Sequence, residues 1–314
     1  MSFTRSGGES WLTDSDDTTC NTGNIQSVSV TLDTSIPLTW VRVGISDAVY
    51  LDQIQLSYQL SGSSTSLACP GLCKAKVDNQ TLDIECSTTE PVSGVTLSGS
   101  GVTGLCSLYI SGGRNVALKQ TAQQSSRYSP PYAPDSFKAE NAVDGVLPGD
   151  TVERSARSTC THTVPDTQPG WWTVTFSQAV DVTWFLIYNR ADCGQGCRDR
   201  LVNFTLTAQS DPRPATSYSY TDPGGYGQTS YTVVPSPRIS FPVSLVRFVT
   251  ANYINILALC EVFVFGETNC PAGRFGLRCE RQCNCANQES CFVHNGRCPS
   301  GCATGYTGEE CSGG

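Results

Sequence analysis

Two arginines and a histidine near the middle of the chain have the chemistry to bind hydroxyl groups. His162 is one of only two histidines, and Arg190 and Arg200 lie in one polar segment downstream of it. A guanidinium is a planar fork of donors that can bind two oxygens, and an imidazole nitrogen can bind a third. With Asp192 orienting an arginine, this set suits a deoxy-sugar. The alternative is an ordinary surface ion-pair cluster.

The elements that position these residues are predicted to be β-strands. Short alternating runs rich in Val, Thr, Phe and Tyr are separated by Gly, Pro, Ser and Asp clusters, and helical periodicity is nearly absent. In residues 172–176, Trp-Thr-Val-Thr-Phe, every second residue is large and apolar, as a sheet with one buried face requires. The chain is therefore predicted to be all-β.

An internal repeat indicates the domain organisation. Residues 28–40 parallel residues 172–184, and residues 104–112 parallel residues 258–266. Two copies of one β domain are expected in tandem, joined at Ser111-Gly-Gly113. The predicted domains are 1–112, 113–268 and 269–314.

Each copy has two cysteines at equivalent places. Cys20 with Cys106, and Cys160 with Cys260, are expected to tie the start of each sandwich to its last strand. Closing a loop near 100 residues removes unfolded-state entropy worth on the order of 4–5 kcal/mol. These disulfides would be structural.

The first copy is shorter than the second before its first cysteine, so its first strands are expected to be missing or replaced. It also has an odd number of further cysteines. Cys73 with Cys86 could close a hairpin, leaving Cys69 free or paired to something absent.

The tail is rich in cysteine, with eight of the 17 cysteines after residue 269. That density favours an oxidising compartment and a disulfide framework. Cys-x-Cys and Cys-x3-Cys spacings also suit zinc, but the glycine punctuation fits disulfide loops better. So short a segment cannot bury a useful core, and cross-links would supply its stability.

Gly-Arg-Phe-Gly and the closing Gly-Tyr-Thr-Gly-Glu-Glu-Cys311 make the tail resemble laminin-type and multiple-repeat epidermal-growth-factor (EGF-like) modules. Such a module would be a spacer. The resemblance implies the pairs Cys283–Cys291, Cys285–Cys298 and Cys302–Cys311, with Cys270–Cys279 left from a preceding unit.

Residues 114–267 resemble the F-type lectin, or fucolectin, family. The motifs are Asn115-Val-Ala-Leu-Lys-Gln-Thr-Ala-Gln-Gln-Ser-Ser, Asn141-Ala-Val-Asp144-Gly, His162, Arg190-Ala-Asp192 and a basic residue before Leu201. The resemblance implies a jelly-roll, galactose-binding-like sandwich, preceded here by a degenerate copy, and α-L-fucose as the ligand. In the first copy Thr22 replaces the histidine and Ser46 replaces the arginine, so we expect no such fucose site there.

One departure from the family concerns two cysteines. Family members commonly have adjacent cysteines after Arg-x-Asp, and their vicinal disulfide packs on the sugar. Here the sequence is Cys193-Gly-Gln-Gly-Cys197, and a small loop disulfide whose sulfur could still cover an apolar ring face is expected. The insertion also leaves a choice of basic residue: Arg198 is nearer Asp192, whereas Arg200-Leu-Val-Asn keeps the family's following residues.

By the same resemblance, a structural calcium ion is expected. Its ligands would be the side chains of Asp144, Thr159 and Glu261 and the carbonyls of Asn141, Val146 and Cys260. Two carboxylates, a hydroxyl and carbonyls would suffice for a hard cation. Asp144 could instead be an ordinary turn residue in Asp-Gly. Ser107 stands in the first copy where Glu261 stands in the second, so no ion is expected there.

Composition limits the partners and the location. Charged residues make up 15% of the chain and the net charge is −8, so nucleic acid would be repelled. No apolar run approaches the roughly 20 residues that span a bilayer, and the N-terminus has no signal-peptide core, as in a mature or ectodomain fragment. Sequons at Asn79 and Asn203, with the cysteines, predict a glycoprotein that is secreted or on the extracellular face of the plasma membrane.

The expected function is a lectin for fucosylated glycans on microbes or other cells, serving innate immunity or cell adhesion. The alternative is a protein-binding adhesion ectodomain in which sugar binding has been lost, because sandwiches host many ligands. Modest single-site affinity would call for clustering on a surface or in an oligomer. The chain has no Gly-x-Ser-x-Gly, His-Glu-x-x-His or phosphate-binding glycine loop, so an enzyme is not expected.

Overall fold

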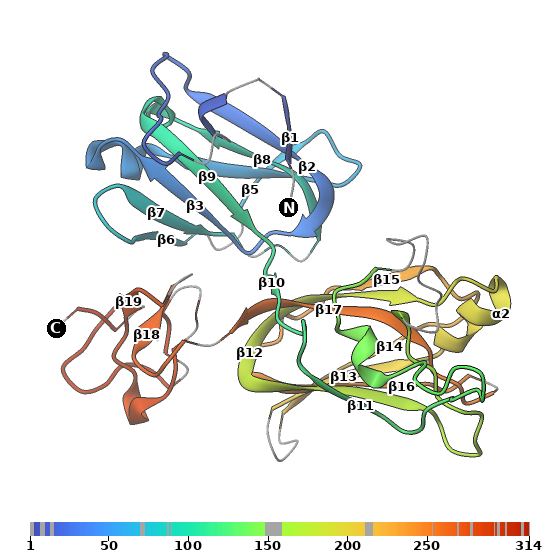
Figure 1. Ribbon diagram of the computed structural model, residues 1–314. Helices are drawn as coiled ribbons and strands as arrows, with labels where there is room; N and C mark the ends of the chain where they lie inside the picture. Colours follow the sequence, from blue (N-terminus) through green and yellow to red (C-terminus); the bar gives the residue numbers. More distant parts are fainter. Residues whose placement is uncertain are drawn as a thin grey trace. The chain divides into compact units, whose positions relative to one another are not determined.

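The structure of the chain is a computed structural model that describes residues 3–6, 10–12, 16–69, 73–86, 88, 90–147, 159–210, 216–252, 254–268, 270–276, 279–291, 293, 296–298, 300–308 and 311–313. Unit 1 comprises Met1–Gly112 and Cys270–Gly314, and unit 2 comprises Gly113–Asn269. Strands dominate the described residues, and the helices are short (Figure 1). The predicted all-β fold is confirmed, while the division into three domains stays a prediction.

A two-sheet sandwich forms the N-terminal part of unit 1. Its strands are β1 (Phe3–Ser6), β2 (Ser27–Pro37), β3 (Trp40–Ile45), β4 (Gln55–Leu60), β5 (Ser66–Ala68), β6 (Cys73–Lys76), β7 (Thr81–Glu85), β8 (Pro91–Ser98) and β9 (Leu105–Ser111). Its 3₁₀-helices are η1 (Ser10–Leu12), η2 (Ala48–Gln53) and η3 (Ser100–Gly104). The sheet orders are β1-β2-β8-β4-β5 and β6-β7-β3-β9. Val41 and Val43 are fully buried in the core while Arg42 between them is not, which is the period of two that a half-buried strand requires.

Unit 2 is also a β-sandwich. Its strands are β10 (Arg114–Asn115), β11 (Thr121–Gln124), β12 (Trp171–Asn189), β13 (Thr205–Gln209), β14 (Ser217–Thr221), β15 (Ser230–Val233), β16 (Val243–Val249) and β17 (Leu259–Thr268). Its helices are η4 (Ala139–Ala142), α2 (Gln195–Arg198) and η5 (Asp199–Leu201). Trp172, Phe204 and Phe248 are fully buried and lie ring against ring in its core.

The long strand β12 belongs to both layers of unit 2. Its first residues pair with β11 and β16, and its last residues pair with β15 and β17. Figure 1 shows the strand folding over at a corner between these two arms. Gly170, just before β12, donates to Asn255, and Asn189 at its end pairs with Leu259. Both ends of β12 therefore lie at one end of the sandwich, beside the segment that leads into β17.

The two sandwiches share their ladder geometry. The order β1-β2-β8-β4-β5 in unit 1 corresponds to β11-β12-β16-β13-β14 in unit 2. A register shift falls between Thr31 and Ile36 in β2, and another between Thr175 and Val180 in β12. These are equivalent places in the sequence repeat, so the repeated segments occupy equivalent positions in the two units.

Eight disulfides join the described cysteines. They are Cys20–Cys106, Cys69–Cys86, Cys160–Cys260, Cys193–Cys197, Cys270–Cys279, Cys283–Cys291, Cys285–Cys298 and Cys302–Cys311. Seven of these pairs are the ones expected from the sequence.

The suggested pairing of Cys73 with Cys86 is wrong, because Cys86 bonds Cys69. Strands β6 and β7 do form the expected hairpin, but Cys73 pairs in register with Glu85. Consecutive residues of a strand face opposite sides, so Glu85 and Cys86 point away from each other. Cys86 is fully buried and reaches Cys69 in the core instead.

The tail of unit 1 has little regular structure. It contains β18 (Arg274–Phe275), β19 (Arg281–Gln282) and η6 (Ala286–Gln288). Its core consists of Phe275 and five buried cysteines. The sulfur atoms of Cys283, Cys285 and Cys291 lie within 4.8 Å of one another, but all three are in disulfides and offer no thiolate to zinc. Within the described part of the chain, no helix is long and apolar enough to cross a membrane.

Candidate functional site

His162 is held in an extended segment beside the entry to β17. The N–H groups of Thr161 and Thr163 donate to Leu259 and Leu257 at 2.6 and 3.0 Å. The histidine is 5% exposed, and its Nδ1 lies 2.7 Å from the carbonyl oxygen of Thr163. A carbonyl can only accept, so Nδ1 carries the proton and Nε2 is left as an acceptor.

Two aromatic rings that the sequence analysis did not single out line the imidazole. The ring centroids of Tyr128 and Phe137 lie 5.0 and 5.2 Å from that of His162. Phe137 is buried, whereas Tyr128 is 41% exposed. Both come from the loop between β11 and η4, where no strand or helix periodicity marks inward-facing residues. Their aromatic character was the only available signal.

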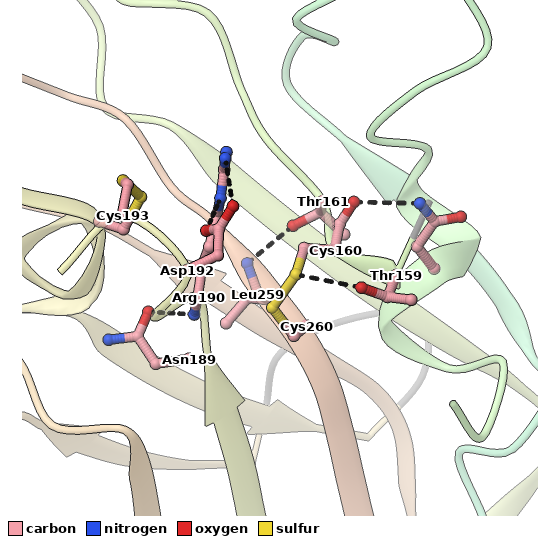
Figure 2. Close-up of a disulfide and its surroundings, with 11 residues drawn as sticks. Thr159, Cys160, Thr161, Asn189, Arg190, Asp192, Cys193, Leu259 and Cys260 are labelled. Carbon is pink, nitrogen blue, oxygen red and sulfur yellow. Dashed lines mark hydrogen bonds and ion pairs between the residues drawn. A yellow bond between two sulfur atoms is a disulfide. The ribbon is translucent and has the colours of Figure 1, made fainter. Parts of the chain in front are cut away.

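Arg190 and Asp192 form a two-point ion pair immediately after β12 (Figure 2). Arg190 Nε donates to Asp192 Oδ1 at 2.7 Å, and Nη2 donates to Oδ2 at 3.1 Å. The Arg190 guanidinium also lies 4.9 Å from the centre of the Phe137 ring. Among the described residues, none accepts a hydrogen bond from Arg190 Nη1. One corner of an oriented guanidinium thus remains for a ligand.

The backbone around Arg190 is fixed by the buried side chain of Asn189. Its Oδ1 accepts from the Arg190 N–H at 2.7 Å, and its Nδ2 donates to the carbonyls of Arg198 and Gln228, each at 2.8 Å. Asn189 therefore joins the end of β12 to two further loops. The site is built on this junction.

Arg200, rather than Arg198, belongs to the same cluster as His162. The Arg200 charge acts on both His162 and Asp192. Arg198 instead donates to Gln195 Oε1 at 2.7 Å within its own helical turn. Of the two basic residues that the sequence left open, Arg200 is the one whose charge lowers the pKa of the histidine.

The Cys193–Cys197 disulfide borders the ion pair. A carboxylate oxygen of Asp192 and the two sulfur atoms lie within 4.8 Å of one another. Cys193 is exposed and Cys197 is fully buried, because α2 turns the second cysteine inward. The disulfide therefore lies next to the carboxylate that holds Arg190.

The surroundings of His162 and Asp192 shift the pKa values of both side chains. Burial and the charges of Arg200 and Arg190 lower the pKa of His162 to about 4. The imidazole is therefore neutral at pH 7. Burial tends to raise the pKa of Asp192, but the ion pair with Arg190 outweighs it and the pKa lies below its usual value. The site presents fixed positive donors and one neutral acceptor.

The six residues expected around calcium gather at the start of β17. Glu261 is fully buried; its Oε1 accepts from the Gly145 N–H at 3.1 Å, whereas Oε2 accepts no hydrogen bond from the described residues. Gly145 has a φ of +85°, which favours glycine, and Asp144 Oδ1 accepts from the Val146 N–H at 2.8 Å. Burial and the charge of Asp144 raise the pKa of Glu261 to about 8.

The remaining expected ligands adjoin the Cys160–Cys260 disulfide. Asn141 Nδ2 donates to the carbonyl of Cys160 at 3.0 Å, which ties η4 to the disulfide. The Thr159 hydroxyl lies 3.8 Å from Cys160 Sγ and is buried (Figure 2). A buried carboxylate with an orphaned oxygen and a second carboxylate beside it fits a bound cation, which would offset both charges.

The corresponding positions of unit 1 have different chemistry. Ser107 pairs with Gly44 in the ladder as Glu261 pairs with Tyr188. Ser46 follows β3 as Arg190 follows β12. Unit 1 therefore offers neither carboxylate nor guanidinium at these two places.

Asn79 and Asn203, the predicted glycosylation sites, are both exposed. Asn79 lies in the turn between β6 and β7, and Asn203 has a positive φ of 52° just before β13. Both positions are accessible, and their glycosylation stays a prediction.

Comparison with known proteins gives one family match and several similar solved structures. A sequence profile described as "NedA-like, galactose-binding domain" matches residues 141–240. No curated protein matches the chain. A fucose binding module from Streptococcus pneumoniae is 24% identical over 51% of this chain and 99% of that chain, with a TM-score of 0.39.

Two further structures are similar at the same level. The lectin domain of Lectinolysin, solved with Lewis B antigen, is 24% identical over 49% of this chain and 98% of that chain, with a TM-score of 0.40. A fucolectin from striped bass (Morone saxatilis) serum is 21% identical over 82% of this chain and 90% of that chain, with a TM-score of 0.34. Unit 2 is a galactose-binding-like β-sandwich, and the profile match lies within it.

Proposed function

We propose that unit 2 is a lectin domain that binds α-L-fucose at the cluster of His162, Arg190 and Arg200. The observation that carries this proposal is the convergence of a neutral buried imidazole with two guanidinium groups. His162 and Arg190 come from separate segments of the chain, yet both lie against the Phe137 ring, at 5.2 and 4.9 Å from its centre. The charge of Arg200 lowers the pKa of the same histidine. A surface ion-pair cluster has no need for a buried histidine that keeps an acceptor nitrogen.

A sugar hydroxyl both donates and accepts, and the cluster supplies a partner for each role. His162 Nε2 accepts a hydrogen bond from one hydroxyl, and Arg190 Nη1 donates a hydrogen bond to an adjacent oxygen. Arg200 supplies a second guanidinium. Asp192 holds Arg190 in place, and the Cys193–Cys197 disulfide covers an apolar part of the ring.

Calcium is proposed as a structural cofactor held by Asp144, Glu261 and Thr159, with the carbonyls of Asn141, Val146 and Cys260. Its contribution is to neutralise two carboxylates that burial would otherwise make costly. The orphaned Oε2 of Glu261 supports this assignment. The ion would fix the 141–146 loop to β17, next to the disulfide that precedes His162.

The rest of the chain is assigned on the same basis. We propose that the sandwich of unit 1 is a degenerate copy without this fucose site, and that the tail is an EGF-like spacer. The eight disulfides fit a secreted or cell-surface protein, with fucosylated glycans on microbes or other cells as partners. Clustering on a surface or in an oligomer would supply avidity.

A glycan array distinguishes this function from protein adhesion. The protein, with calcium, is applied to fucosylated glycans and to the same glycans lacking fucose, beside an Arg190→Ala variant. Signals confined to fucosylated glycans and absent for the variant support the lectin. No glycan signal from the folded protein would favour the adhesion ectodomain.

A further inference from the structure

Unit 2 has a second hollow that the fucose cluster does not occupy. This cavity of about 480 Å³, here called the Trp171 pocket, is lined by Ser126, Val164, Asp166, Gln168, Trp171 and Arg247 among others. None of the residues assigned to fucose or to calcium lines it. Its polar groups therefore need another explanation.

Arg247 is held in the pocket by stacking. Its guanidinium lies 4.7 Å from the centre of the Trp171 ring, and Thr173 rather than Trp171 is its ladder partner, so the two side chains meet diagonally across β12 and β16. No described residue accepts a hydrogen bond from the guanidinium or forms an ion pair with it. Stacking fixes a donor fork without using its N–H groups.

Acceptors lie on the same pocket wall. Asp166 Oδ1 accepts from the N–H and hydroxyl of Thr167 at 2.6 and 3.2 Å, while no described residue donates to its Oδ2. Gln168 is exposed and adds an amide that both donates and accepts. Arginine, carboxylate, amide and indole together match a neutral sugar, whose hydroxyls need both donors and acceptors. Asp166 and Arg247 carry opposite charges, so a ligand with a net charge of either sign would meet one like charge in the pocket.

The pocket lies directly beside the fucose cluster. Val164, in its wall, is two residues beyond His162, and an extended chain of two residues spans at most about 7 Å. The segments 126–128 and 162–164 run side by side: the Tyr128 N–H donates to the carbonyl of His162, and the Val164 N–H donates to Ser126 Oγ. His162 and Tyr128 lie at one end of these two segments, and Ser126 and Val164, at the other end, line the pocket.

We propose that the Trp171 pocket is a subsite for a neutral pyranose unit of the same glycan whose fucose occupies the His162 cluster. This inference rests on the proposed fucose site and specifies its ligand as an oligosaccharide. Fucose is then the anchor, and the pocket selects which fucosylated glycan binds tightly.

Calorimetric titration tests the subsite with free L-fucose and a set of fucosylated tri- to hexasaccharides. The wild-type protein is expected to bind the best oligosaccharide at least about tenfold more tightly than fucose, a difference of about 1.4 kcal/mol. Arg247→Ala should reduce that affinity to near the value for fucose, with fucose binding unchanged. Arg247→Lys keeps the charge but loses the fork, and should lie between the two.

The outcomes separate the two proposals. The subsite is contradicted if fucose binds but the oligosaccharides bind no more tightly than fucose. It is also contradicted if Arg247→Ala still binds the oligosaccharide more tightly than fucose. In both cases the fucose site stands. If neither fucose nor any oligosaccharide binds the folded protein, the fucose site fails and the subsite fails with it. Thermal unfolding of each variant verifies that it is folded.

Discussion

The guanidinium of Arg190 donates two hydrogen bonds to the carboxylate of Asp192, at 2.7 and 3.1 Å, and its Cζ lies over the Phe137 ring, 4.9 Å from the ring centre. Two residues from different segments, Asp192 and Phe137, thus fix the orientation of the Arg190 guanidinium. A preoriented fork loses little conformational entropy when a ligand binds, and this arrangement leads to two predictions about its supports.

Asp192→Asn is expected to weaken fucose binding about five- to tenfold, because Arg190 loses a charged partner that orients it. Stability should change by less than about 1 kcal/mol, since the Asp192 side chain is 46% exposed. Calorimetry and denaturant unfolding measure the two effects. Asp135→Asn removes a carboxylate that pairs with Lys138 instead, and should leave fucose binding unchanged. Equal affinity in wild type and Asp192→Asn would contradict this role.

Phe137→Leu should weaken fucose binding about three- to tenfold, because it removes the ring face beneath Arg190, a contact worth about 0.5–2 kcal/mol. Leucine keeps most of the buried volume, so the loss of stability should be modest. Phe241→Leu is the matched control, since Phe241 packs at the edge of the unit 2 core. A comparable loss of affinity in both variants would point to general loosening of the core.

The pH dependence of fucose binding should follow the buried His162. Because its pKa is lowered to about 4, Nε2 stays an acceptor, and affinity should be constant from pH 8 to about pH 5.5 and fall near pH 4. Calorimetry across this range measures it. An inflection near pH 6.5, the value of an ordinary histidine, would contradict the burial.

The same group makes folding stability depend on pH. A histidine whose pKa is lowered by folding contributes stability that is complete above pH 6.5 and is lost as the pH falls towards 4. The loss from His162 would reach about 3 kcal/mol at most. Denaturant unfolding at pH 7 and pH 4.5 should show a smaller difference for His162→Gln than for wild type. Identical differences would contradict the assignment.

Calcium should raise the unfolding temperature of unit 2, because it binds the Glu261 and Asp144 carboxylates only in the folded state. Since the pKa of Glu261 is raised to about 8, the ion displaces a proton at pH 7, and the effect should be larger at pH 8.5. Each kcal/mol corresponds to roughly 2–4 °C for a domain of this size. Glu261→Gln should abolish most of the response. Glu267→Gln is the control, because Glu267 is equally buried but pairs with Arg114. A wild-type melting temperature that is the same with calcium and with chelator would contradict the ion.

Much of the fold could be predicted from the sequence, because the alternation of apolar residues within a short segment identifies a β-strand. The alternation in residues 172–176 and the repeat of residues 28–40 fixed the strand type and the equivalent ladder positions. The Cys69–Cys86 pair did not follow, because it depends on which face of β7 each residue occupies, and the alternatives differ by one residue of register.

Site residues could be predicted where the side-chain type itself indicates a role in binding. They could not be predicted where the role depends on how distant segments pack together. His162 is one of only two histidines, and Arg190 and Asp192 were predicted from their residue types and from the Arg-x-Asp motif of the resemblance. Choosing Arg200 over Arg198 required the fold, in which Arg198 donates to Gln195 within α2 whereas the charge of Arg200 acts on His162. Phe137 lies in an aperiodic loop and holds Arg190 across the fold, so no local pattern identifies it.

Whether unit 2 binds fucose through Arg190 is measured by calorimetric titration of L-fucose into the calcium-loaded wild type and into Arg190→Ala. We expect saturable heat for the wild type and a loss of affinity of at least about a hundredfold for the variant, which lacks the whole guanidinium group. No heat with L-fucose or with fucosylated oligosaccharides from a folded wild-type protein, or equal binding by the variant, would contradict it.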